Sequence, residues 1–426
     1  MSLDLQHKST PPSLVLRQLS HQSSPVPIIQ IMVASSDLID FTSLGPSPRR
    51  DLNFQELTNF DGYRCETHHA TTEDGYILGI HRIPLSDSCP SECAEREPIV
   101  YTHGLLLCGD DCILPGPGKS HCYNLADACY DMWVINNRGN RYSRNHTTLN
   151  PDKDSEFWNF SIDEMASLDM PAAIDYILEV TNKKQVIIVA HSQGSTISIL
   201  MCAKRPEYND KIKIGFAMSP VSSLYDAKMF GLGIMKALAK LLDGDNNKTH
   251  SEIFPHGGLG QAAAIGLCGF SEIQYPVCIS ILFASLGYEK FQITPDTMRA
   301  IPGHIPDGTS LKNFVHWGQI KKYGFCEFNH GPKGNLKKYN QEMPPQFNLN
   351  PVKVRWILLA GLQDNVADVK DAQRLASQLE NSEFCVIEEE NFGHLDFVYA
   401  DTLTKYVTPQ ILLTLKTGKF TCNKYQ

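Results

Sequence analysis

The chemistry that this chain could perform centres on Ser192, in the segment Gln185–Gly194, which reads QVIIVAHSQG. An apolar, mostly β-branched run precedes the serine and is typical of a buried strand, and the helix-compatible run Ser195–Ala203 follows it. A serine at the apex of a strained strand-to-helix turn needs small residues two positions before and after it. Those positions hold Ala190 and Gly194, and Ala190 departs from the usual glycine by one methyl group. We predict a nucleophile elbow with Ser192 as the nucleophile; a buried serine in an ordinary turn is the alternative.

A serine nucleophile needs a base and an acid, and in the α/β-hydrolase fold they follow it in the order acid, then histidine. The buried-strand pattern Val354–Gly361 is followed by Asp364 near its tip, and His394 lies in the later turn NFGHLDF. Asp368 competes for the role of the acid, but it directly precedes the predicted helix Val369–Leu379 and suits an N-cap. We therefore favour Asp364 and His394, with a surface-loop histidine as the alternative for the latter.

These residue types fit acyl transfer. Imidazole can take the proton of the serine and return it, while Asp364 would hold the tautomer of His394 and stabilise the imidazolium. The tetrahedral oxyanion needs two preorganised backbone N–H donors. The residue after the nucleophile, Gln193, is one candidate, and Leu105, in the strand-to-loop segment PIVYTHGLLL, is the other. His103 precedes the elbow in the chain, so we interpret it as structural rather than as the base.

Longer strings of the chain resemble the acid lipase family, the group that contains lysosomal acid lipase and gastric lipase. These strings are HGLLL, AHSQG and the segments Asp131–His146, Phe157–Ile177, Pro306–Gln319, Asn335–Leu349, Gly361–Asp371 and Asn391–Tyr399. The family's catalytic positions fall on Ser192, Asp364 and His394, and its oxyanion positions fall on Leu105 and Gln193. The resemblance implies a hydrolase of lipid esters, and its only departure within the elbow is the alanine that replaces a glycine.

The predicted fold class is an α/β-hydrolase, with a mostly parallel sheet flanked by helices. The chain has 426 residues, 42% of them hydrophobic, which is enough for one large catalytic domain. We expect residues 51–220 and 354–426 to form this core, the first part ending after a strand at Lys213–Ala217. Residues 221–353 are too many for a structureless loop, so they predict a helical cap inserted after the sixth strand. Within it, Lys228–Leu242 is apolar nearly all round its helical projection.

An apolar cap over a serine hydrolase site favours a water-insoluble acyl substrate. The leading hypothesis is a lipase that cleaves triacylglycerols or sterol esters at an oil–water or membrane interface, without a cofactor or a metal. A soluble carboxylesterase or acyltransferase with the same triad is the second hypothesis, and a non-catalytic lipid-binding protein is the third. The intact triad argues against the third.

The first fifty residues differ from the rest. Residues 1–50 are rich in serine and proline and predict a disordered N-terminal extension. The resemblance implies a secreted or lysosomal protein, yet the only apolar run here, Val26–Ala34, is interrupted by Pro27 and Gln30 and makes a poor secretory signal. The sequence contains no apolar stretch of the length needed for a transmembrane helix.

The chain contains 13 cysteines, an odd number, so at least one is not paired within the chain. Cys89, Cys93, Cys108 and Cys112 form two C-x3-C pairs that could bind zinc. Without a zinc-ribbon pattern, disulfides or buried thiols are favoured there.

Four further cysteines have other interpretations. Cys122 and Cys129 lie seven residues apart on a predicted helix, where they are expected to be core residues. The spacing of Cys268 and Cys278 resembles that of the acid lipase cap disulfide, which implies that these two are paired.

Surface features point to the secretory route rather than to nucleic acid. Three N-glycosylation sequons begin at Asn145, Asn159 and Asn247. The net charge of −9 disfavours nucleic acid as a partner.

Overall fold

The computed structural model describes residues 45–84, 96–229, 231–242, 246–271, 274–286 and 292–422. Most of the predicted N-terminal extension, residues 1–44, lies outside the described residues. Its last part was predicted wrongly, because Ser47 and Arg49 are buried. The guanidinium of Arg49 forms an ion pair with Asp61 and also donates to the carbonyl of Leu114, so these residues belong to the core.

An eight-stranded sheet forms the centre of the molecule, in the strand order β1-β2-β4-β3-β5-β6-β9-β10. The two pairings that involve β2 are antiparallel and all the others are parallel. The strands are β1 (Glu66–Thr71), β2 (Ile77–Ile83), β3 (Pro98–Thr102), β4 (Asp131–Ile135), β5 (Val186–His191), β6 (Ile212–Met218), β9 (Trp356–Gly361) and β10 (Ser382–Ile387). This mostly parallel sheet confirms the predicted fold class.

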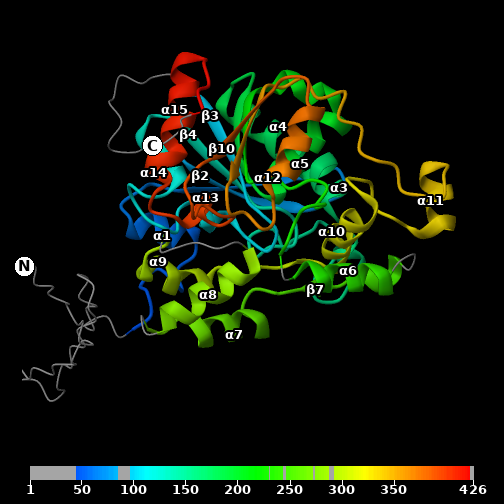
Figure 1. Ribbon diagram of the computed structural model, residues 1–426, viewed down its shortest axis with the longest axis horizontal. Helices are drawn as coiled ribbons and strands as arrows, with labels where there is room; N and C mark the ends of the chain where they lie inside the picture. Colours follow the sequence, from blue (N-terminus) through cyan, green and yellow to red (C-terminus); the bar gives the residue numbers. More distant parts are fainter. Residues whose placement is uncertain are drawn as a thin grey trace, which may run out of the picture.

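Helices cover both faces of the sheet, so successive residues of a central strand enter different cores (Figure 1). In β5, Val186 and Ile188 pack into one apolar cluster with α4 (Met170–Thr181), α5 (Gln193–Lys204) and α12 (Val369–Gln378). The intervening residues, Ile187 and Val189, pack into the other cluster. That second cluster includes α1 (Phe54–Phe60), α2 (His121–Asp127), α13 (Asp396–Tyr399), α14 (Leu403–Tyr406) and α15 (Thr408–Thr417).

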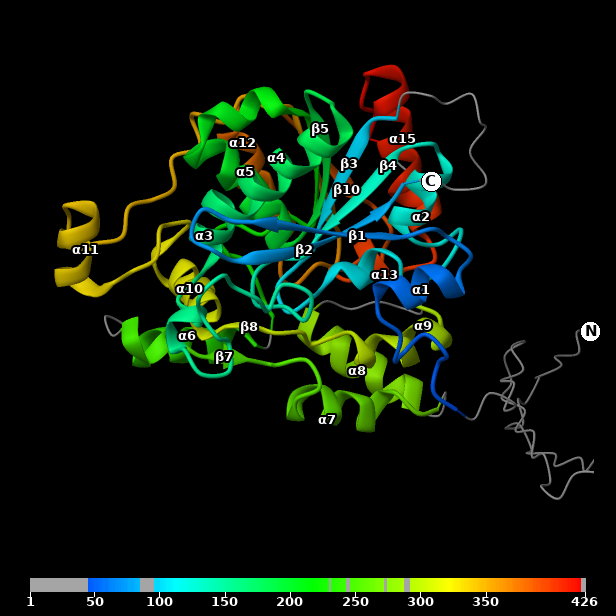
Figure 2. The same cartoon turned by 180° about the vertical axis from the view of Figure 1, so that it is seen from behind.

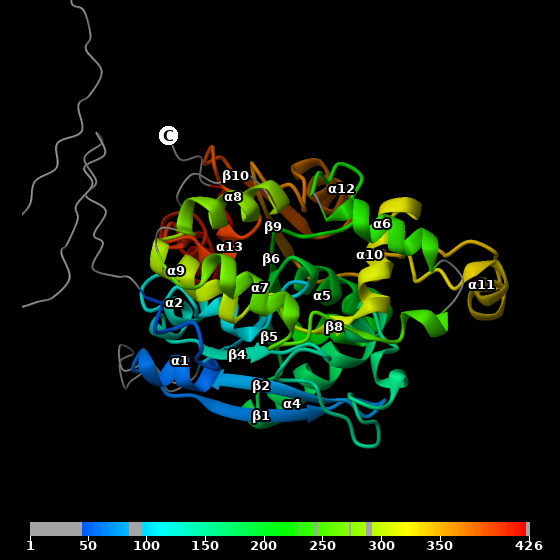
Figure 3. The same cartoon turned by 90° about the horizontal axis from the view of Figure 1, so that it is seen from below.

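The segment between β6 and β9 is called the cap below. Its helices α6 (Leu232–Leu241), α7 (Leu259–Cys268) and α8 (Tyr275–Leu286) lie beneath the sheet in Figures 1 and 2, whereas α11 (Gly331–Tyr339) lies to one side. Figure 3, seen from below, shows α7 and α8 in front of the central strands. The predicted helix at Lys228–Leu242 begins later than expected, at Leu232, since the N–H groups of Lys228 and Met229 instead donate to the carbonyl of Asn365. The cap elements are α6 (Leu232–Leu241), β7 (Glu252–Ile253), α7 (Leu259–Cys268), α8 (Tyr275–Leu286), α9 (Pro295–Ala300), β8 (Thr309–Ser310), α10 (Leu311–Tyr323) and α11 (Gly331–Tyr339).

The cysteines differ from the sequence interpretation in two places. Cys122 is not an unpaired core residue, because it forms a disulfide with Cys112. Cys129 is also disulfide-bonded, and it lies beyond the end of α2 with a φ of 68° rather than on the helix. Cys268 and Cys278 form a disulfide, as Cys385 does with Cys422.

The zinc alternative does not survive these pairings, because Cys112 is oxidised and is no longer a thiolate ligand. Cys108 is a buried thiol, while Cys89 and Cys93 lie outside the described residues. No group of metal-ligating side chains occurs in the part of the chain that the structure describes. Among the described helices, none is long and apolar enough to cross a membrane.

The lowered pKa values of the buried histidines predict that the fold loses stability in mild acid. Burial lowers the pKa of His103 and His121 to about 4 and that of His81 and His191 to about 3. Above pH 6.5 these groups are neutral whether the chain is folded or unfolded, so they contribute nothing there. Below pH 6.5 only the unfolded chain takes up their protons, and stability falls as the pH drops towards 4.

Four buried carboxyls among the described residues act in the opposite direction, since burial raises the pKa of each. The pKa of Asp307 rises to about 6 and that of Glu327 to about 7, and those of Asp111 and Asp169 rise as well. These carboxyls favour the folded state as the pH falls, but nine described histidines have a lowered pKa and outnumber them. We expect urea unfolding to give a lower free energy at pH 5 than at pH 7. His121→Gln should reduce this difference, whereas the same change at the exposed His69 should not; equal stability at the two pH values would contradict the expectation.

Candidate active site

Ser192 lies between the last residue of β5 and the first residue of α5, and its backbone is strained, with φ 53° and ψ −121°. The turn is tight because α5 passes close to β3: a Cβ on Gly194 would lie 2.3 Å from the carbonyl oxygen of Thr102. Glycine is therefore required at that position. Two residues before the serine, the methyl group of Ala190 is fully buried within the sheet core, so this position accommodates the departure from glycine.

The structure brings the three predicted side chains into one hydrogen-bonded chain. The Nε2 atom of His394 lies 2.8 Å from the Oγ of Ser192, and its Nδ1 atom lies 2.9 and 3.0 Å from the two carboxylate oxygens of Asp364. All three residues are buried. The sequence separations are 202 and 30 residues, so only the fold brings these groups together.

The environment of Asp364 keeps it charged. Burial raises the pKa of this carboxyl, but the charge of His394 and several hydrogen bonds outweigh that effect and lower the pKa overall. The donors to the carboxylate include the backbone N–H groups of Val366 and Ala367, each at 2.8 Å. The competing acid, Asp368, instead caps α12 and accepts from the N–H of Lys370 at 2.9 Å.

The two candidate oxyanion donors lie beside the serine. Gln193 is the first residue of α5, and the first N–H groups of a helix have no partner within it. Leu105 lines the same cavity as Ser192. In His103, one ring nitrogen contacts the carbonyl of Gly104 at 2.9 Å and the other accepts from the N–H of Asn137 at 3.1 Å, which suits a neutral structural residue.

A cavity of about 930 Å³ extends from Ser192 and His394 beneath the cap. Ligand sites of this kind usually measure about 300–1,000 Å³, so this one is large. Its lining is almost wholly apolar and comes from the loop after β3 and from several cap helices. The lining residues include Leu105, Leu106, Leu107, Leu224, Met229, Leu232, Met235, Ala263, Ala264, Leu267, Phe314 and Trp317.

One cap helix, α10, is attached directly to the elbow. The side-chain oxygen of Gln193 accepts from the indole N–H of Trp317 at 2.8 Å and from the amide of Asn313 at 3.0 Å. All three side chains are buried. Sequence reasoning treated Gln193 only as a backbone donor and did not identify these contacts, because residues about 120 positions apart carry no local signal.

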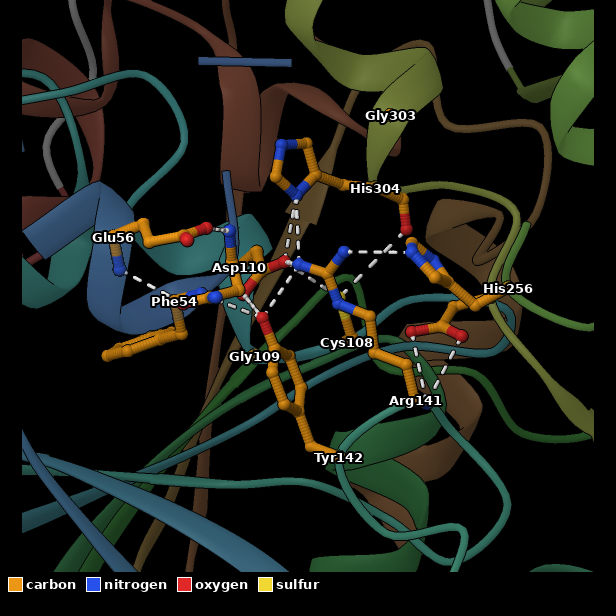
Figure 4. A network of polar contacts seen from close by, with 12 residues as sticks. Phe54, Glu56, Cys108, Gly109, Asp110, Arg141, Tyr142, His256, Gly303 and His304 are labelled. Carbon is orange, nitrogen blue, oxygen red and sulfur yellow. Dashed lines mark hydrogen bonds and ion pairs between the residues drawn. The ribbon is translucent and has the colours of Figure 1, made fainter. Parts of the chain in front are cut away.

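A second attachment between cap and core adjoins the loop that carries Leu105 (Figure 4). Arg141 and His304 both contact the buried carboxylate of Asp110, and the hydroxyl of Tyr142 donates to the same carboxylate at 2.8 Å. Nearby, the backbone N–H of Asp307 donates to the carbonyl of Leu106 at 2.9 Å. These contacts fix the cap segment that precedes β8 against the loop after β3.

Ser219 is a further site residue that sequence reasoning missed. It directly follows β6, and its hydroxyl contacts both Asp364 and His394. Its position at the carboxyl end of a parallel strand, where ligand sites of such sheets lie, was the available signal.

The predicted glycosylation sites differ in accessibility. Asn145 is exposed, whereas Asn159 is partly buried and its amide nitrogen donates to Glu156 at 2.6 Å. Lys312 donates to the side-chain oxygen of Asn159. The side chain of Asn247 lies outside the described residues. Glycosylation remains a prediction, and it is favoured at Asn145.

The strand order, the elbow and the serine–histidine–carboxylate chain define an α/β-hydrolase, and the family described as "alpha/beta hydrolase fold" matches residues 97–401. A second family, described as "Partial alpha/beta-hydrolase lipase region", matches residues 54–115. Within this class the chain belongs to the acid lipase family, as its sequence resemblance predicted.

Three relatives carry this assignment. Lipase member K of Homo sapiens is 32% identical, with 87% of this chain and 92% of the relative covered. Gastric triacylglycerol lipase of Rattus norvegicus is 34% identical, with coverages of 84% and 91%. Lipase 1 of Drosophila melanogaster is 33% identical, with coverages of 85% and 80%.

Proposed function

We propose that the protein hydrolyses carboxylic esters of lipids, such as triacylglycerols or sterol esters, through an acyl-enzyme formed on Ser192. The observation that carries the proposal is the large apolar cavity, which ends at a serine hydrogen-bonded to a histidine. An acyl chain or a sterol ring gains roughly 25 cal/mol for each Å² of apolar surface that it buries there. Relatives named as lipases support the same conclusion.

The geometry supports an ordinary two-step acyl transfer. His394 Nε2 takes the Ser192 hydroxyl proton as Oγ attacks the ester carbonyl carbon. The oxyanion of the tetrahedral intermediate would accept from the N–H groups of Leu105 and Gln193. The bond to the leaving alcohol then breaks, and His394 returns the proton to that oxygen. Water repeats the sequence on the acyl-enzyme and releases the fatty acid, while Asp364 stabilises the imidazolium in both steps.

The outer surface of the cap supports a lipid interface as the partner. Four large apolar side chains on or next to α6, α7 and α8 are exposed to solvent and lie outside the cavity lining, and α7 carries no charged residue. They are Leu241, Leu259, Phe270 and Val277. Exposed apolar side chains on the cap suit contact with a lipid phase. The cap, residues 221–353 by our proposal, would therefore both cover the cavity and meet the substrate phase.

The disulfides support a location in an oxidising compartment. Three complete cysteine pairs lie within the described residues, and such bonds persist mainly in secreted and lumenal proteins. We therefore place the protein on the secretory route, either secreted or lysosomal.

A chain-length series of esters, assayed with and without an emulsion across pH 4 to 8, tests the function. Emulsified long-chain esters should be hydrolysed faster than short soluble ones, since only long chains fill the cavity. An enzyme that prefers short soluble esters and ignores the emulsion would be a soluble carboxylesterase, which is the second candidate function.

A single substitution in the cap can distinguish an effect on contact with lipid from an effect on ester hydrolysis itself. Leu259 is 91% exposed and lies outside the cavity lining, so Leu259→Ser removes apolar contact with lipid without changing the site. We expect activity on the emulsion to fall several-fold while hydrolysis of a short soluble ester stays unchanged. The matched control is Leu413→Ser on α15, which is exposed but far from the cap in Figure 1. Equal losses on both substrates would show that Leu259 acts only on folding.

A further inference from the structure

The backbone of Ser219 has a conformation that serine rarely adopts. It is the first residue after β6, and its backbone N–H donates to the carbonyl of Leu359 in β9 at 2.7 Å. Its φ is 52°, in the left-handed region where glycine or asparagine is the usual residue. The side chain is fully buried and is not part of the cavity lining, so a bound ester would not reach it.

The hydroxyl of Ser219 contacts two members of the proposed triad at once. Its Oγ donates a hydrogen bond to Oδ2 of Asp364 and lies 2.9 Å from Nδ1 of His394. With its single proton directed at the carboxylate, the Oγ lone pairs face the Nδ1–H of the imidazole. The hydroxyl of Ser219, the carboxylate of Asp364 and the imidazole of His394 therefore each contact the other two.

Both oxygens of Asp364 consequently have fixed partners. Oδ1 accepts from the N–H groups of Val366 and Ala367, Oδ2 accepts from Ser219, and the imidazole of His394 contacts both oxygens. Without the hydroxyl, Oδ2 would keep only the imidazole as a partner. The carboxylate could then rotate away from the position in which it orients the imidazole.

A second titratable side chain packs against His394 in addition to Asp364. It is His191 of β5, whose ring centre lies 5.0 Å from that of His394. Burial lowers the pKa of His191 to about 3, so it stays neutral in the range in which the enzyme would act. Among the described residues, Asp364 is the carboxylate that contacts His394.

We propose that Ser219 is a positioning residue of the triad: its hydroxyl fixes the orientation of the Asp364 carboxylate against the imidazole of His394. This inference rests on the proposed function, since it requires that His394 is the base. Ser219 does not touch the substrate, and it acts through Asp364 and His394 alone.

The test compares Ser219→Ala and Ser219→Gly with the wild type on a short soluble ester across pH 4 to 8. Glycine suits the positive φ, so the glycine variant removes the hydroxyl while relieving backbone strain. A hydrogen bond to a charged group corresponds to a factor on the order of 10 to 100, so we expect kcat to fall by about that factor with KM little changed.

Ser222→Ala is the matched control. Ser222 lies three residues further along the same segment, is also buried, and donates to the backbone carbonyl of Asp371 rather than to the triad. Its loss should leave both kcat and KM unchanged. Ser219→Asn should restore part of kcat, since asparagine tolerates a positive φ and supplies an N–H donor to Asp364.

The proposal is overturned if folded Ser219→Gly retains the kcat of the wild type. It is also overturned if kcat falls equally in Ser222→Ala, because the effect would then follow from the loss of any buried hydroxyl. A wild-type enzyme that lacks ester hydrolysis altogether would instead contradict the proposed function, so the two failures are distinguishable.

Discussion

Replacing Ser192 by alanine is expected to abolish ester turnover and to leave the protein folded. The change removes the attacking oxygen and only a small part of the packing, because the residue lines the cavity and is not part of the apolar core. Loss of the nucleophile of such a triad lowers kcat by a factor on the order of 10⁶. The small remaining rate would come from substrate binding and from the oxyanion donors.

The measurement is kcat on a soluble ester, with the fold checked by thermal unfolding. Ser195→Ala serves as the control, since Ser195 lies one helical turn further on and its hydroxyl donates to the carbonyl of Ala190 at 2.9 Å. The control should retain most of the wild-type kcat. A folded Ser192→Ala protein that keeps more than a small fraction of the activity would rule out Ser192 as the nucleophile.

Replacing Asp364 by asparagine is expected to lower kcat by about 10⁴, the second largest effect. The side chain keeps its shape, but an amide can present an N–H to Nδ1 of His394, which favours the wrong tautomer and leaves Nε2 protonated. Such an imidazole cannot accept the proton of Ser192. The loss should appear in kcat far more than in KM, because Asp364 does not line the cavity.

Asp368→Asn is the matched control for this prediction. Asp368 accepts from the N–H of Lys370 as the N-cap of α12, and asparagine caps a helix about as well as aspartate. The variant should keep kcat within about twofold of the wild type and should change stability only slightly. The reverse ranking of the two variants, in folded proteins, would identify Asp368 as the acid.

The sequence could predict those roles that depend on residues close together in the chain. The strained elbow around Ser192 needs small residues at fixed offsets, and the order of acid and histidine follows from the fold. Asp364 and Asp368 could be told apart because capping is a local property, and the structure places Asp368 at a helix N-terminus. Central strands were located to within about two residues because buried parallel strands are continuous apolar runs.

Contacts between distant segments could not be predicted in the same way. The pairing of Cys122 with Cys112 depends on how the loop after β3 folds back onto α2, and no periodicity records that. Cys385 and Cys422, 37 residues apart, likewise meet only because α15 packs beside β10. The sequence signal for Ser219 was its position after a predicted strand, which is weak because a serine there is common and its partners lie more than 140 residues away.

The attachment of α10 to Gln193 bears on how enzymes of this kind can be recombined. A chimera that exchanges the whole segment 221–353 between relatives would separate Trp317 and Asn313 from the glutamine beside the nucleophile, whose side chain they hold. An exchange limited to α6–α9 would leave that contact intact and transfer the part of the cavity wall that these helices and their connections supply. The cap is thus one insertion in the chain with two parts that evolve differently. Helices α6–α9 are free to diverge with the substrate, whereas α10 must be exchanged together with the catalytic core.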